Sequence, residues 1–98
     1  ALVLAYHSQG QVIFWNFENM ATQQAKKIGD ELARVSGYAL EEATGVSSYA
    51  GYKDWFIKKF GRPGYTVEVG KGKNPLPISQ FFMIYDNNLA LLLLASVI

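Results

Sequence analysis

The pattern of apolar and polar positions divides the chain into strand-like runs and helical stretches. Residues 2–6 are continuously apolar, which is typical of a strand buried on both faces. Residues 11–17 are rich in aromatic and β-branched side chains, which favours a second strand. The run YTVEV, residues 65–69, alternates between large apolar and polar side chains and predicts a third strand with one buried face.

Three other segments have helical character. Asn19 is a predicted N-cap, and the helix after it ends at Gly37, a residue suited to the left-handed position beyond a helix. Its apolar stripe, spaced by three and four residues, consists of Ala21, Ala25, Ile28, Leu32 and Val35. Residues 52–60 predict a short helix that stops at Gly61. Residues 78–97 predict a long helix that is apolar around most of its circumference.

The strongly apolar end of this last helix is short for a membrane span. The run LALLLLASVI has ten residues, whereas a span needs about 20. We therefore expect a buried helix and no membrane span.

The order of these elements predicts the α/β class. Strands separated by helices favour a partial parallel or mixed sheet with flanking helices, and residues 38–50, which have no clear period, are expected to form an ordered loop. A chain of 98 residues makes one domain at most. Because it opens without Met inside a strand-like run, we expect it to be a portion of a longer protein.

Composition excludes several classes of function. The net charge is +1 and no basic block is present, so nothing indicates nucleic-acid binding. The absence of cysteine excludes disulfides, thiolate metal sites and cysteine nucleophiles, but it does not identify a compartment. No signal peptide is visible at the start.

Two residues with catalytic potential fall at strand ends. His7, the only histidine, ends the first predicted strand, and Glu68 lies near the end of the third. In open α/β sheets, sites cluster outside the carboxyl ends of the strands. A neutral imidazole can bind a metal ion, and a carboxylate can act as general base towards metal-bound water. The alternatives are a structural histidine and a glutamate that faces solvent.

Several motifs resemble those of a known family. The segments AYHSQGQVIFWNFEN, SYAGYKDWF and GYTVEVG, in this order, resemble the second half of the carboxypeptidase A-like zinc peptidases. YAGYKDWFI and YTVEVGKGKNPLPISQF are similar to the bacterial γ-D-glutamyl-L-diamino acid endopeptidases, which cut peptidoglycan stem peptides. The resemblance covers the whole chain. It implies the C-terminal half of a zinc carboxypeptidase-like fold, with residues 1–98 forming an incomplete catalytic domain.

The resemblance also implies roles for individual residues. His7 would be the third ligand of one zinc ion, and Glu68 the general base that takes a proton from zinc-bound water, whose pKa the metal lowers towards ~7. Lys53 would line the pocket for the residue after the cut bond and pair with a substrate carboxylate; the alternative is an ordinary exposed lysine. Ser8 is a further candidate substrate contact. Tyr49 is another, unless it is a loop aromatic that packs on the surface.

The chain also departs from the family pattern. With no second histidine, the His-x-x-Glu motif that supplies the first two zinc ligands is missing. The two arginines, Arg34 and Arg62, lie outside any matching motif. A catalytic zinc needs about three protein ligands, so we expect zinc only in the longer protein and an inactive isolated chain. We expect Asp54 to cap or pair locally rather than to act in catalysis.

Two functions of different classes remain open. The first is a portion of a bacterial zinc peptidase, cell wall-associated or cytoplasmic, that hydrolyses γ-D-glutamyl–diamino acid bonds in peptidoglycan-derived peptides. The second is a non-catalytic binding or interaction module built on the same half-fold. In either case the apolar residues 2–6 and 89–98 predict that the isolated chain forms a homo-oligomer or exchanges elements between copies.

Overall fold

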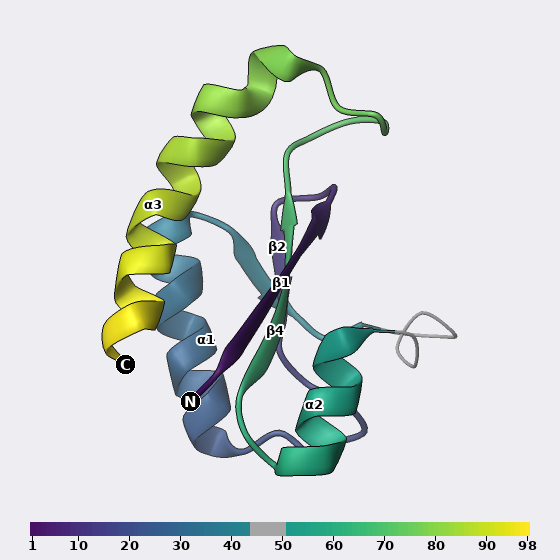
Figure 1. The fold of residues 1–98 in the computed structure, drawn as a ribbon, viewed down its shortest axis with the longest axis vertical. Helices are drawn as coiled ribbons and strands as arrows, with labels where there is room; N and C mark the ends of the chain where they lie inside the picture. The colour runs from purple at the N-terminus through teal and green to yellow at the C-terminus, as the bar shows by residue number, and fades with distance from the viewer. Residues whose placement is uncertain (44–50) are drawn as a thin grey trace.

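A computed structural model describes residues 1–43 and 51–98 and gives an α/β fold (Figure 1). The described chain contains a four-stranded mixed sheet in the order β1-β4-β2-β3, in which β4 runs parallel to β1 and antiparallel to β2, and β3 runs parallel to β2. The strands are β1 (Val3–Ser8), β2 (Val12–Phe14), β3 (Ala39–Glu41) and β4 (Gly64–Val69). The helices are α1 (Gln23–Ser36), α2 (Tyr52–Phe60) and α3 (Phe81–Val97), the last preceded by a 3-10 turn, Ile78–Gln80. The predicted class and mixed sheet are confirmed.

The sheet has a helical layer on each side. Helices α1 and α3 lie together against one face, and α2 lies on the other side (Figure 1). The main core forms on the α1/α3 side from Ile13, Leu32, Tyr38, Tyr65, Val67 and Leu91. The Tyr65 hydroxyl donates a hydrogen bond to the Ala25 carbonyl oxygen at 2.6 Å and so links β4 to α1. On the α2 side, the polar strand residues His7, Thr66 and Glu68 line a cavity.

The first strand is placed differently from the sequence prediction. Strand β1 lies at the edge of the sheet, and within the described residues it pairs only with β4. Its residues are half-buried over the first half and exposed over the second half. The expectation of a strand buried on both faces is therefore wrong, because a continuous apolar run does not reveal whether a strand has one neighbour or two.

Helix α1 follows the predicted stripe but starts later. Thr22 is the N-cap: its hydroxyl oxygen accepts a hydrogen bond from the Ala25 N–H at 3.1 Å. The prediction of Asn19 as N-cap is wrong, because Asn19 lies in the preceding turn with φ of 60°. Gly37 ends the helix as predicted, with φ of 78° and its N–H bonded to the Ala33 carbonyl. Strand β3 was missed in the stretch expected to be a loop.

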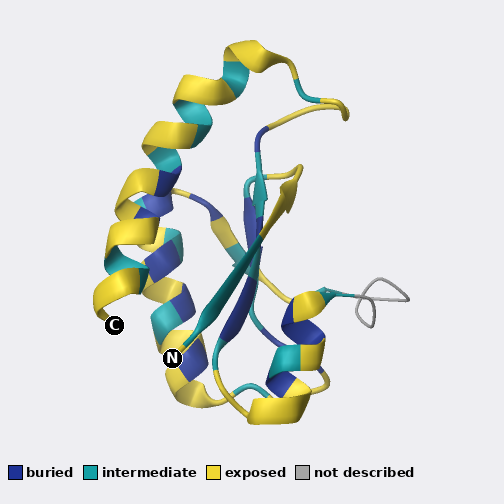
Figure 2. Cartoon of the chain, viewed as in Figure 1, coloured by how far each residue is buried: buried dark blue, intermediate teal, exposed yellow. Residues whose placement is uncertain are grey.

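Helix α3 confirms the predicted long helix but not its burial. Its buried residues are Asn88 and Leu91, whereas Phe82 is 76% exposed and Leu93 61% exposed, and Figure 2 shows most of this helix coloured as exposed. The expectation of a buried helix is wrong because one side packs against α1 while the other has no partner among the described residues. The segment Ile78–Val97 is long and apolar enough to cross a membrane. A single such helix is weak evidence of insertion, since core helices of soluble proteins meet the same criterion.

Candidate functional site

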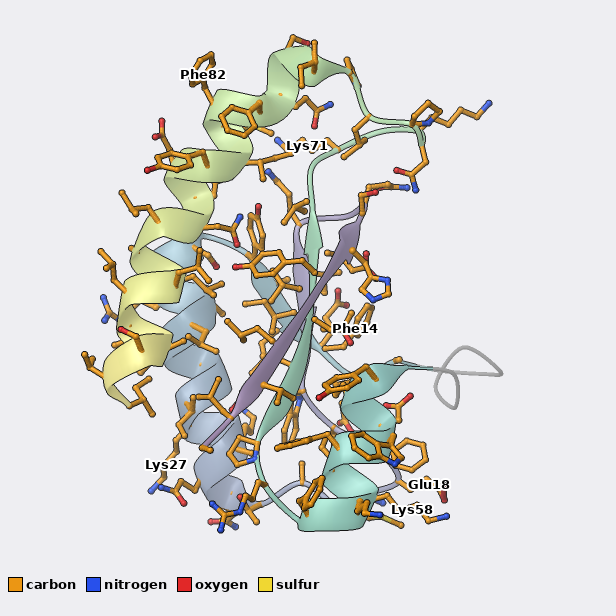
Figure 3. The ribbon with its side chains drawn as sticks, viewed as in Figure 1. Phe14, Glu18, Lys27, Lys58, Lys71 and Phe82 are labelled. Carbon is orange, nitrogen blue, oxygen red and sulfur yellow. The ribbon has the colours of Figure 1, made fainter. Side chains whose placement is uncertain are left out.

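A cavity of about 550 Å³ lies on the α2 side of the sheet. The strands contribute His7, Phe14, Thr66 and Glu68, and the beginning of the α2 region contributes Gly51, Lys53 and Asp54. The end of β3 and the residues after it contribute Glu41, Glu42 and Ala43. Figure 3 shows Phe14 beside the middle of the sheet, with the exposed Lys58 and Glu18 towards the distal end of α2. The cavity is thus built from the sheet, the residues that follow β3 and the beginning of α2.

His7 and Glu68 occupy paired positions in this cavity. They are register partners across the parallel strands β1 and β4, and each is the next-to-last residue of its strand. Neighbouring strands lie about 4.8 Å apart, and paired positions project to the same side of the sheet. His7 is exposed and Glu68 half-buried. The structure therefore brings together the two side chains that the sequence singled out, while their chemical roles stay predictions.

These two residues do not make a complete zinc site. Across residues 1–43 and 51–98, no group of three or more His, Cys, Asp or Glu side chains is arranged to hold a metal ion. A catalytic zinc takes about three protein ligands and a water molecule. The ligand set in the described chain therefore does not fit a zinc ion held by this chain alone.

Lys53 and Asp54 form a buried ion pair at the wall of the cavity. Their exposed fractions are 3% and 4%. The Lys53 ammonium donates to Asp54 Oδ1 and to the Asn16 carbonyl oxygen, the latter at 2.5 Å. Asp54 Oδ2 accepts the Gly51 N–H at 3.0 Å, which caps α2. The alternative of an exposed Lys53 is wrong, and the expected local pairing of Asp54 is confirmed.

Ser8, another predicted substrate contact, is not brought to this cavity. Ser8 faces the loop after β4: its hydroxyl donates to Asn74 Oδ1 at 2.8 Å, and the Asn74 amide donates to the Ser8 carbonyl at 3.1 Å. Ser8 is not among the residues that line the cavity. Tyr49 lies outside the described residues. Both contacts stay predictions.

Sequence reasoning missed the acidic wall of the cavity. Glu41 is the last residue of β3 and Glu42 follows it. This strand has three residues, too few for a periodic sequence signal. Glu42 is held by the Asn16 side-chain amide, which donates to its Oε1 at 2.8 Å. Thr66 could have been found, since it is two residues before Glu68 and so shares its face.

Comparisons relate the chain to part of a peptidase. No protein-family model matches it. It is 53% identical over 93 residues to gamma-D-glutamyl-L-diamino acid endopeptidase 1 of Lysinibacillus sphaericus, a match that covers 95% of this chain and 23% of that protein. It is 40% identical over 84 residues to the uncharacterized protein YqgT of Bacillus subtilis (strain 168), covering 86% of this chain and 22% of that protein. The chain thus spans less than a quarter of each relative, one of which is a named endopeptidase.

Proposed function

We propose that this chain is a portion of a zinc-dependent peptidase that hydrolyses γ-D-glutamyl–diamino acid bonds in peptidoglycan stem peptides. The observation that carries the proposal is the pairing of His7 with Glu68 across β1 and β4 in one cavity. The similarity to the Lysinibacillus endopeptidase supplies the bond class. A half-buried carboxylate beside an imidazole at the carboxyl ends of two parallel strands suits hydrolysis.

In this proposal each of the two residues has one role. Glu68 is the general base, which accepts a proton from the attacking water and passes it to the leaving amine. His7 is one ligand of the zinc ion, and the remaining ligands come from polypeptide outside residues 1–98. The isolated chain is then inactive, and its fold is the C-terminal half of a carboxypeptidase-like catalytic domain. The α/β sheet with a cavity at strand ends supports that placement.

Substrate recognition involves the cavity wall. A lysine ammonium has three N–H donors, and two of those of Lys53 are used by Asp54 and Asn16. In this proposal the third N–H, at the cavity wall that Lys53 lines, meets a carboxylate of the diamino acid. Ser8, which does not line the cavity, and Tyr49, which lies outside the described residues, remain proposed contacts. Both relatives are bacterial, which supports a bacterial enzyme that is either cell wall-associated or cytoplasmic.

A segment exchange tests the proposal directly. The matching 93-residue segment of the Lysinibacillus endopeptidase is replaced by this chain, and zinc-dependent release of the diamino acid from a γ-D-glutamyl peptide is measured. We expect an active chimera. Glu68→Gln should lower kcat at least ~100-fold, the usual contribution of a general base, and His7→Ala should lower zinc content.

The matched control is Glu18→Gln, an exposed glutamate towards the distal end of α2 (Figure 3), which should leave activity unchanged. A folded, zinc-loaded chimera without activity would contradict the proposal. So would a Glu68→Gln chimera that turns over at the unmodified rate.

One observation favours a binding module as the second candidate. The described residues lack a group of three metal ligands, so the chain on its own has a cavity without a metal centre. In that case the isolated chain would bind the stem peptide in a heteronuclear NMR titration, and binding would persist in Glu68→Gln. Hydrolysis by the chimera would exclude this second function.

A further inference from the structure

The buried charges of α2 join three segments that are distant in the sequence. Lys53 and Asp54 are adjacent in the first turn of α2, and both point inwards rather than to water. Taking two charges out of water is costly unless further hydrogen bonds satisfy them. Here the partners are present: within the described chain no buried side-chain nitrogen or oxygen atom lacks one.

The hydrogen bonds continue beyond the ion pair. Lys53 donates to the Asn16 carbonyl in the β2–α1 connection, and the Asn16 side chain donates to Glu42 after β3. The Asn16 amide oxygen is itself fixed by two backbone N–H groups, from Phe17 at 2.8 Å and Ala21 at 3.1 Å. At the other end, Asp54 accepts the Gly51 N–H. We call this chain of contacts, Glu42–Asn16–Lys53–Asp54–Gly51, the Lys53 relay.

The relay coincides with one wall of the cavity. Four of its members line the cavity: Glu42, Gly51, Lys53 and Asp54. Asn16 connects them without lining the cavity itself. His7 and Glu68, on the sheet, take no part in the relay. The relay therefore fixes the wall that faces the candidate catalytic pair without touching that pair.

We propose that Lys53 is a positioning residue, which holds the Glu42 carboxylate and the first turn of α2 in place as the substrate-facing wall of the cavity. A hydrophobic pair of similar volume could fill the same space without loss of stability, but it would not orient Glu42 through Asn16. The inference rests on the proposed function only for its catalytic consequence. It is separate from the proposed contact of Lys53 with substrate, because it uses the other two N–H groups.

The isolated chain allows a test that needs no activity. In Lys53→Met the Asp54 carboxylate would stay buried without a counter-ion, so Lys53→Met/Asp54→Asn is the informative variant. We expect the fold to be kept, and the Asn16 side-chain amide signal and the backbone amide signals of Glu42 and Gly51 to shift in nitrogen-15 NMR spectra. Lys58→Met, an exposed lysine of the same helix, is the matched control and should shift none of them. Unchanged Asn16 and Glu42 signals in the folded double variant would overturn the proposal.

The exposed end of the relay gives a second test that does not depend on the buried pair. Glu42→Ala should move the side-chain ammonium signal of Lys53, although no hydrogen bond or ion pair joins these two residues. Glu41→Ala, the adjacent exposed glutamate in the same cavity, should not. Equal effects of the two substitutions would contradict transmission through Asn16.

The chimera then separates positioning from chemistry. Asn16→Ala breaks the relay behind the cavity wall, so KM should rise at least ~5-fold while kcat stays within about twofold, the signature of lost substrate binding rather than lost transition-state contact. If Lys53 acted only by contacting the substrate, the KM of Asn16→Ala would stay unchanged. An unchanged KM would therefore overturn the positioning role. If the unmodified chimera is inactive, the proposed function fails while the NMR tests still decide the relay.

Discussion

The packing of α3 through a single buried row can be tested with two leucines of the same helix. Leu91 is fully buried in the core cluster, whereas Leu93 is 61% exposed. Truncating a fully buried leucine to alanine removes its transfer free energy and leaves a cavity, at a cost of ~3–5 kcal/mol. Less than half of the Leu93 side chain is withdrawn from water, so Leu93→Ala should cost ~1 kcal/mol or less. The same chemical change is thus expected to differ at least threefold in effect.

Urea denaturation followed by far-ultraviolet circular dichroism measures the difference. With a slope of ~1.5 kcal/mol per molar urea, usual for a small domain, Leu91→Ala should lower the midpoint by ~2 M or more and Leu93→Ala by well under 1 M. The measurement is repeated at two protein concentrations to detect association. Equal losses for both variants in a monomeric sample would refute the arrangement in which α3 docks through Leu91 with its opposite side in water.

Four further predictions follow from other parts of the molecule. Gly70→Ala should cost ~2–3 kcal/mol in the same assay, because φ is +80° and an added Cβ would overlap a Leu76 methyl. Gly72→Ala, with open space around it, should cost ~1 kcal/mol. Burial raises the pKa of Tyr65 well above its usual value of 10. Because the unfolded tyrosine loses its proton at lower pH than the folded one, the free energy of unfolding should fall as pH rises above about 10. Tyr65→Phe should reduce that fall. Light scattering of the isolated chain should give a mass above 10.9 kDa at tens of micromolar, and a single-chain mass would contradict self-association. Calorimetric zinc titration should show weak or no binding both to the unmodified chain and to His7→Ala. Tight zinc binding by the unmodified chain that is lost in His7→Ala would contradict the incomplete site.

The sequence predicted the helices and strands that are determined by their own residues and not by contacts with distant parts of the chain. The helix Tyr52–Phe60 and the strand through YTVEV were found because Gly61, the alternation and the apolar spacing are all local features. The start of α1 was missed because Asn19 and Thr22 both have N-cap side chains, and only the backbone turn decides between them. Strand β3 has three residues and depends on pairing with β2, a contact that leaves no trace in a short window of sequence.

The site was predictable to the extent that strand ends are predictable. His7 and Glu68 were paired from their positions at the ends of two strands, and the register confirms that these positions are neighbours. The burial of Lys53 was not predicted, because a lysine in a short amphipathic helix is ordinarily exposed and its partner here, the Asn16 carbonyl, lies 37 residues away in the chain. Long-range polar contacts of this kind have no sequence period.

The edge position of β1 determines where the rest of a zinc site would have to lie. His7 has Glu68 on one side, across the hydrogen-bonded pairing with β4, and on the other side no strand is present in the described part of the chain. The cavity lies on the α2 face, and α2 contributes a lysine and an aspartate that already neutralise one another. Further ligands to a metal on His7 would therefore approach from the open edge of β1. That edge lies next to an apolar hollow of about 310 Å³ between Tyr6, Val69 and the exposed side of α3. Tyr6 and His7 are consecutive in β1 and therefore project to opposite faces of the sheet, the hollow lying on the α3 face and the cavity on the α2 face. A polypeptide that covered the hollow alone would not bring ligands to His7, whereas one that ran along the open edge of β1 would reach both faces.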